Sequence, residues 1–111
     1  MNVLVCGGRH YSNYAKMKRT LKAYDIASLV HGGATGVDQL ADRYARCNGI
    51  ETHRYPAEWD FFGKRAGHLR NERMLLMHPE IDLVIAFAGG PGTADMIRTA
   101  QSRGVQVRKI R

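Results

Sequence analysis

The chain has 111 residues, of which 44% are hydrophobic, and a formal net charge of +7 at pH 7. This length predicts one domain, residues 1–111, with a single core. No apolar run approaches the roughly 20 residues of a membrane span, and the N-terminus lacks the pattern of a signal peptide. The two cysteines, Cys6 and Cys47, do not have metal-knuckle spacing. We expect two buried free thiols in a reducing compartment.

Strand-like and helix-like segments alternate along the chain. The expected strands are 2–6, 27–31, 51–55, 82–87 and 105–109, and the expected helices are 13–24, 36–48, 67–77 and 92–103. A long loop, 56–66, carries Trp59, Phe61 and Phe62. The run 82–87 is the most apolar strand and is expected to be central. This alternation predicts an α/β fold, a single Rossmann-like doubly wound parallel sheet of about five strands with helices on both faces.

Three glycine-rich loops each follow a strand and lead into a helical segment. They read Cys6-Gly7-Gly8-Arg9, His31-Gly32-Gly33-Ala34-Thr35-Gly36-Val37-Asp38 and Ala88-Gly89-Gly90-Pro91-Gly92-Thr93. A strand, a glycine turn and a helix N-terminus together make an anion site, because unpaired N–H groups and the helix dipole point at one place. In a sheet of order 3-2-1-4-5 the three loops line one crevice where the strand order reverses. The sequence therefore predicts a site for a phosphorylated ligand.

Several side chains of the first two loops are candidates for this site. Arg9 is placed to fork onto a phosphate, or is a solvated surface residue. Thr35 suits a helix N-cap. Asp38 either complements the dipole of the helix or contacts a ribose hydroxyl, and His31 is more often structural than catalytic in such a position.

The remaining candidates follow in the second half of the chain. Gly92 and Thr93 open a helix at which amides and a hydroxyl grip a phosphate together. Arg70 and Asn71 are expected in the first turn of the helix at 67–77, on the crevice side. Trp59 either stacks on a base or covers the edge of the core. The full set of expected ligand-binding residues is Gly7, Gly8, Arg9, Gly32, Gly33, Ala34, Asp38, Trp59, Arg70, Asn71, Gly89, Gly90, Gly92 and Thr93.

These motifs together resemble those of the YspA-like, cpYpsA-related branch of the SLOG superfamily. The resemblance rests on Val-x-Cys-Gly-Gly-Arg, His-Gly-Gly-Ala-x-Gly-Val-Asp, Pro-Ala-x-Trp, Ala-Gly-x-x-Arg-Asn-x-x-Met and Ala-Phe-x-Gly-Gly-x-Gly-Thr-Ala-Asp-Met, between Val3 and about Val107. It implies a Rossmann-like fold, a nucleotide-derived ligand and a homo-oligomer, a dimer or higher. It also implies that Gly89, Gly90, Gly92 and Thr93 hold phosphate, with Arg70 and Asn71 beside it.

One position departs from the related Lonely Guy phosphoribohydrolases. Those enzymes resemble Gly-Gly-x-Gly-Thr-x-x-Glu, whose final Glu helps to cleave an N-glycosidic bond, whereas this chain has Met96 there. Asp95 is one residue earlier and is rotated by roughly 100° on a helix. It is a weak candidate for a catalytic acid, because geometry must be right before pKa matters.

Three functions are compatible with these features. The first is binding without chemistry of a nucleotide-derived molecule, of ADP-ribose type or a cyclic nucleotide signal. The second is hydrolysis, as a nucleotide N-glycosidase or phosphoribohydrolase. The third is nucleic-acid binding by the basic surface. Because no effector domain is visible, a binder is expected to sequester its ligand, such as a defence signal, in the cytoplasm of a bacterial or phage-infected cell. No cofactor, metal or membrane partner is expected.

Overall fold

The computed structural model describes all 111 residues as one α/β domain. Its sheet is wholly parallel and has the order β3-β2-β1-β4-β5. The strands are β1 (Asn2–Cys6), β2 (Ser28–His31), β3 (Glu51–Arg54), β4 (Leu83–Ala86) and β5 (Gln106–Lys109). The helices are α1 (Tyr14–Lys22), α2 (Val37–Cys47), α3 (Trp59–Phe62), α4 (Ala66–Met77) and α5 (Pro91–Ser102), with one 3₁₀ turn, η1 (Gly63–Arg65). The predicted fold class is confirmed, and the strand order is the one in which the three glycine loops are expected to share a crevice.

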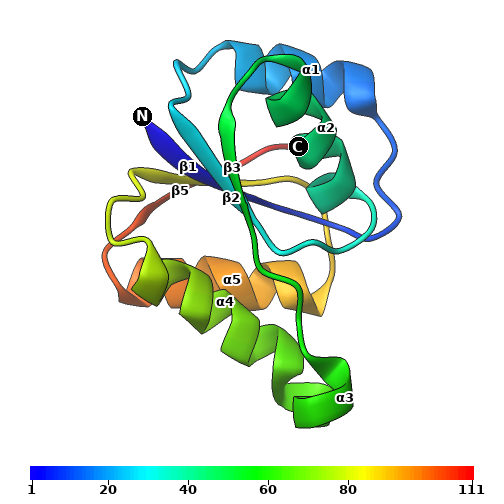
Figure 1. The fold of residues 1–111 in the computed structure, drawn as a ribbon, viewed down its shortest axis with the longest axis vertical. Helices are drawn as coiled ribbons and strands as arrows, with labels where there is room; N and C mark the ends of the chain where they lie inside the picture. The colour runs from blue at the N-terminus through cyan, green and yellow to red at the C-terminus, as the bar shows by residue number, and fades with distance from the viewer.

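Helices cover both faces of the sheet. Figure 1 shows α1 and α2 in one layer and α4 and α5 in the other, with the strands between them. Successive side chains of a strand point to opposite faces. Accordingly, Val3 and Val5 of β1 pack in the cluster that contains residues of α1 and α2, whereas Leu4 packs in the cluster with residues of α4 and α5. The sheet therefore has a separate apolar core on each face.

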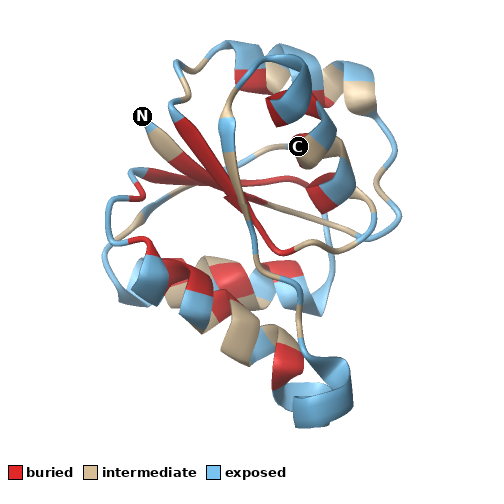
Figure 2. Cartoon of the chain, viewed as in Figure 1, coloured by how far each residue is buried: buried red, intermediate tan, exposed pale blue.

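The buried strands are those in the middle of the sheet. All four residues of β2 and of β4 are buried, as are the three central residues of β1. The edge strands β3 and β5 are polar and largely exposed (Figure 2). The apolar run at 82–87 forms an inner strand, β4, but the central position expected for it is occupied by β1. The inner strands β2, β1 and β4 are the ones that lead into the three glycine loops.

The start of α2 differs from the prediction. Gly36, not Thr35, is its N-cap residue, with φ of +75° and no side-chain capping bond. A Cβ atom at Gly36 would clash with the carbonyl oxygen of Gly8. Positive φ and this close approach both require glycine. The second loop therefore turns into α2 directly against the first loop.

The segment 56–66 is not a plain loop. It holds α3 and η1, and α4 already begins at Ala66. Figures 1 and 2 show α3 as an exposed projection at the end of the molecule, beyond the helix layer of α4 and α5. Both cysteines are free, as expected, but neither is fully buried: Cys6 is partly buried and Cys47 is exposed. None of the helices combines the length and apolar character needed to cross a bilayer.

Candidate functional site

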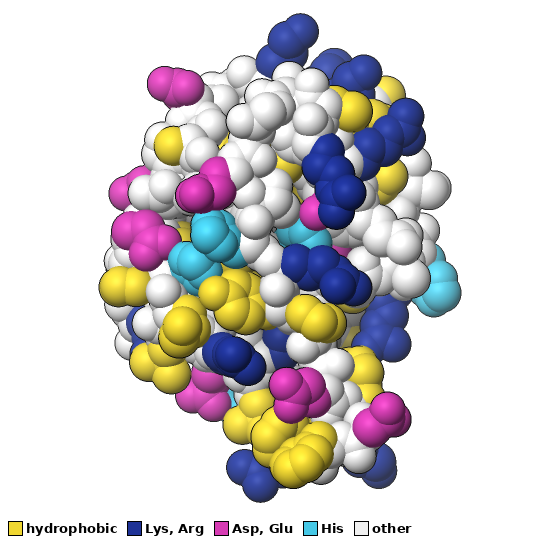
Figure 3. All heavy atoms as spheres, in the orientation of Figure 1, with side chains coloured by type: hydrophobic (Ala, Val, Ile, Leu, Met, Phe, Trp, Pro, Cys, Tyr) yellow, Lys and Arg dark blue, Asp and Glu magenta, His cyan; other side chains and the backbone are white.

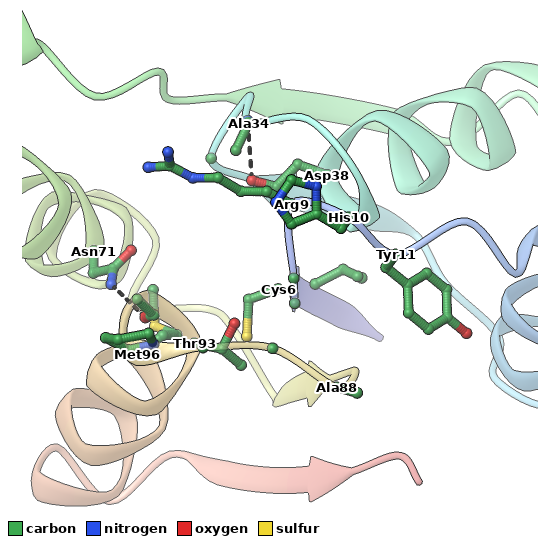
Figure 4. A pocket seen from close by; sticks show the side chains of 18 of the residues that line it. Cys6, Arg9, His10, Tyr11, Ala34, Asp38, Asn71, Ala88, Thr93 and Met96 are labelled. Atoms are coloured by element: carbon green, nitrogen blue, oxygen red, sulfur yellow. Dashed lines mark hydrogen bonds between the residues drawn. The ribbon is translucent and has the colours of Figure 1, made fainter.

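A cavity of about 770 Å³ lies beyond the carboxyl ends of β1, β2 and β4. Twelve of the fourteen residues expected at the site line it: Gly7, Gly8, Arg9, Gly32, Ala34, Asp38, Arg70, Asn71, Gly89, Gly90, Gly92 and Thr93. The close-up in Figure 4 shows side chains from the three loops and from α4 around one space. Gly33 and Trp59 do not line it. The parallel sheet thus brings the loops to one place, as the strand order predicted.

The first and third loops touch each other at their glycines. The N–H of Gly8 donates to the carbonyl oxygen of Ala88 at 2.8 Å. A Cβ atom at Gly8 would lie 2.9 Å from that oxygen. A Cβ atom at Gly89 would clash with the hydroxyl of Thr93 and lie 2.8 Å from the amide nitrogen of Gly8. Only glycine permits this approach, so the two loops form a continuous wall of backbone.

The N-terminus of α5 faces the cavity with unpaired backbone donors. The helix begins at Pro91, and Gly90 at the N-cap has no side chain to cap it. The first intrahelical bond runs from the N–H of Ala94 to the carbonyl of Gly90 at 3.1 Å. The N–H groups of Gly92 and Thr93 therefore lack intrahelical partners. No acidic residue lies in the first turn, so the positive end of the helix dipole is not neutralised locally.

Arg70 and Asn71 of α4 bind two of the loops together. Nη1 of Arg70 donates to the carbonyl oxygen of Gly32 at 2.8 Å, and Nε donates to Oδ1 of Asn71 at 2.9 Å. Nδ2 of the buried Asn71 donates to the carbonyl oxygen of Gly92 at 3.3 Å. Because α4 begins at Ala66, the two residues lie in its second turn and not in its first. They hold the second and third loops at fixed positions around the cavity.

The remaining donors of Arg70 are free for a ligand. Its protein hydrogen bonds use Nε and Nη1, and Nη2 makes none. Burial lowers the pKa of Arg70, opposed by the charge of Asp38, but a guanidinium remains protonated in proteins. The positive charge of Arg70 is therefore permanent and half-buried at the cavity wall.

Asp38 is the carboxylate that lines the cavity. Its side chain is only 6% exposed, and Oδ2 accepts the N–H of Ala34 at 3.1 Å, as drawn in Figure 4. Burial raises the pKa of Asp38, although the Ala34 N–H and the charges of His31 and Arg70 act in the opposite direction. Asp38 thus closes its own loop in the first turn of α2 and also presents a carboxylate to the cavity.

His31 shapes the second loop and explains why Gly33 is not in the cavity. Nδ1 of the buried His31 accepts the N–H of Gly33 at 3.0 Å, and Nε2 lies 2.9 Å from Oδ1 of Asp42. Gly33 has φ of +69°, and a Cβ there would lie 2.8 Å from Nε of Arg54. The structural interpretation of His31 fits this geometry. The expectation that Gly33 lines the site was wrong, because this turn directs it toward β3.

Trp59 also lies outside the cavity. Its ring, 47% exposed, packs on α4 beside Gly67. The guanidinium carbon of Arg9 lies 5.4 Å from the centroid of this ring, within the range of a cation–π contact. Arg9 therefore spans from the first loop to α3 at the mouth of the cavity. The position of Trp59 on α3, which the sequence did not predict as a helix, removes it from the cavity wall.

Asp95 and Met96 occupy opposite environments. Met96 lines the cavity and is 1% exposed. Asp95 does not line it; Oδ1 lies 2.9 Å from Nδ1 of His68, and Oδ2 accepts from Nδ2 of Asn71 at 3.0 Å. Partial burial acts to raise the pKa of Asp95, but hydrogen bonds from His68 and Asn71 outweigh it and hold the pKa below its ordinary value. By accepting this hydrogen bond, Asp95 positions the side chain of Asn71.

Sequence reasoning missed eight lining residues: Val5, Cys6, His10, Tyr11, Met74, Ala88, Pro91 and Met96. The position of Val5 and Cys6 on β1, and of His10, Tyr11, Ala88 and Pro91 in the loops, could have indicated them. Met74 and Met96 could be found only from how α4 and α5 pack.

Cys6 is not a nucleophile candidate, since burial, with a smaller contribution from Asp38, raises the pKa of its thiol to about 12. The hydroxyl of Tyr11 is turned away from the cavity in Figure 4.

A doubly wound parallel sheet with glycine loops around an open helix N-terminus defines a Rossmann-like protein with a crevice beyond the carboxyl ends of its inner strands. The model of the YAcAr family (YspA, cpYpsA-related SLOG family) matches residues 1–62. The chain belongs to this family. It is also 40% identical over 86 residues to the Gene 61 protein of Mycobacterium phage D29, covering 71% of this chain and 67% of that protein. The family match contains the first two loops; α4 and the third loop lie beyond it.

Proposed function

We propose that the protein binds a phosphorylated, nucleotide-derived small molecule in the 770 Å³ cavity. The observation that carries the proposal is the uncapped N-terminus of α5 at a cavity that Arg70 also lines, with Nη2 of Arg70 free of protein hydrogen bonds. Backbone N–H groups, a helix dipole and a guanidinium are the groups that proteins use for phosphate. Arg9 adds a second guanidinium at the mouth. Membership of the SLOG family points to a nucleotide-related ligand as well.

The rest of the lining suits a nucleoside. Val5, Met74, Pro91 and Met96 provide apolar surface beside the polar loops. Ligand sites commonly have volumes of about 300–1,000 Å³ with few polar groups that fix orientation. We assign the phosphate to the N-terminus of α5 and the loops, and the carboxylate of Asp38 to a ribose hydroxyl. A molecule of ADP-ribose type or a cyclic nucleotide has these features.

Binding without chemistry is the preferred form of the proposal. The position at which the Lonely Guy pattern has its Glu is the apolar Met96, which lines the cavity, and the neighbouring Asp95 is held outside by His68 and Asn71. A general acid must reach the leaving group, and Asp95 does not face the space where one would lie. Similarity to a phage protein further favours sequestration of a host signal, such as a nucleotide used in defence.

Hydrolysis is the second candidate, and Asp38 is the observation that favours it. Burial raises the pKa of this carboxyl, and a raised pKa in a cavity is typical of a general acid. In that case Asp38→Asn abolishes turnover while binding persists. In a binder, the same substitution changes affinity only.

The test is mass spectrometry of small molecules after incubation with nucleoside monophosphates, ADP-ribose, NAD and cyclic nucleotides. An intact nucleotide recovered only after heat denaturation establishes a binder. A free base with a ribose phosphate establishes a hydrolase. Recovery of no nucleotide and no product overturns the proposal. Thr93→Ala combined with Arg70→Ala is the control, because it removes two ligand contacts and should abolish recovery from folded protein.

A further inference from the structure

A second, smaller cavity of about 310 Å³ adjoins the first, and Arg70 lines both. It lies between the segment that follows β3 and the first turns of α4. Its lining is Arg54, Tyr55, Pro56, Ala57, Glu58, Phe62, Ala66, Leu69, Arg70 and Arg73. No residue other than Arg70 is common to the two linings. The second cavity is thus a distinct space that meets the phosphate-binding region at one guanidinium.

Three arginines of this cavity have no acidic partner. Arg54, Arg70 and Arg73 take part in none of the ion pairs of the chain. Other arginines do have partners: nitrogen atoms of Arg46, Arg98 and Arg103 lie 2.6, 3.5 and 3.6 Å from carboxylate oxygens. Glu58 is the single carboxylate in the lining, and it makes no ion pair. The second cavity therefore carries net positive charge, which attracts an anionic group.

The same cavity offers flat and apolar surfaces. The hydroxyl of Tyr55 lies 2.7 Å from Nε2 of His78, which fixes the orientation of the ring. The guanidinium carbon of Arg73 lies 5.8 Å from the centroid of that ring. Phe62 and Leu69 add apolar surface. Figure 3 shows Lys and Arg side chains among hydrophobic ones between the body and the projecting tip of the molecule. Aromatic faces next to guanidinium planes are suited to a planar ring.

We infer that the second cavity holds the second ring-bearing end of a pyrophosphate-linked ligand, one with a nucleoside at each end. This inference rests on the proposed function, since the first cavity holds the other nucleoside. Arg70 lines both spaces, and its Nη2 makes no hydrogen bond within the protein. Its guanidinium is therefore the group that pairs with the bridging phosphates. The ligand class is therefore a dinucleotide rather than a mononucleotide.

The test compares the affinity of the protein for AMP and for diadenosine diphosphate by calorimetry. We expect the dinucleotide to bind at least tenfold more tightly. Arg73→Ala, which alters only the second cavity, should remove most of this difference and change AMP affinity less than twofold. Arg54→Ala should act in the same direction. Lys22→Ala, at the end of α1 and outside both cavities, is the charge control and should change neither affinity.

Equal affinity for the two probes overturns the second subsite and leaves the proposed function intact. An equal loss of both affinities in Arg73→Ala also overturns it, because the arginine then acts only through general charge. Binding of neither probe contradicts the proposed function itself, and the subsite with it. Since Arg73 and Arg54 are exposed, both variants are expected to fold, which circular dichroism checks.

Discussion

The substitution Gly92→Ala is expected to change the stability of the protein and its affinity for the ligand in opposite directions. Gly92 is the second residue of α5, and a Cβ atom there would meet nothing within 4 Å. Its φ does not lie in the left-handed region, so alanine fits the backbone. Replacing glycine by alanine at such a site stabilises a protein by about 0.4–1 kcal/mol, chiefly by restricting the unfolded chain. The new methyl group nevertheless lies on a residue that lines the cavity. We expect higher stability together with weaker nucleotide binding.

Gly89→Ala is the matched comparison, three residues earlier in the same loop. Its Cβ would clash with the hydroxyl of Thr93 and lie 2.8 Å from the amide nitrogen of Gly8. Overpacking of this kind costs roughly 1–3 kcal/mol. Urea denaturation of both variants, with calorimetric titration of ADP-ribose, measures the two effects. Unchanged or tighter binding by a stabilised Gly92→Ala protein would refute the assignment of the phosphate to the N-terminus of α5.

Three further predictions concern the supports of the site. Gly36→Ala, which combines a φ of +75° with a clash against the Gly8 carbonyl, should lower the free energy of unfolding by at least about 2 kcal/mol in urea denaturation. Asn71→Ala removes three hydrogen bonds and should cost roughly 2–4 kcal/mol; a loss below about 0.5 kcal/mol would contradict its bridging role. Hydrogen bonding to Asp95 raises the pKa of His68 from 6.5, so its contribution to stability is complete below that pH and is lost as the pH rises through the higher folded value. The stability deficit of His68→Ala should therefore be larger at about pH 5.5 than at about pH 9, and an equal deficit at both would disprove the pairing.

Much of the fold follows from local patterns in the sequence. Glycine pairs after apolar strands, with helical periodicity between them, were sufficient to predict a parallel sheet. The order of the strands in that sheet brings the three loops together. The limits of α2 were harder to predict, because the choice of Gly36 over Thr35 as N-cap depends on contact with Gly8 from another element. Local capping preference favours threonine, and tertiary packing overrides it.

The side chains at the periphery of the site were predicted less well. For Trp59 the sequence left two roles open, stacking on a base or covering the edge of the core. In the structure Trp59 belongs to α3, which was not predicted, and its ring lies against Gly67 and Arg9. Gly33 belonged to a glycine pair of which only Gly32 lines the cavity, because His31 fixes the turn between them. In both cases a contact between distant residues decides the outcome, and such contacts leave no periodic signal in the sequence.

The most direct test of the central claim is a ¹⁵N–¹H NMR titration of the chain with ADP-ribose. We expect shift changes centred on the amides of residues 7–9, 32–38, 70–71, 89–90 and 92–93, with the largest at Gly92 and Thr93, whose N–H groups lack intrahelical partners. Changes centred on the basic residues of α1 or of β5, or no changes at millimolar ligand, would contradict the claim that the three loops form a nucleotide phosphate site.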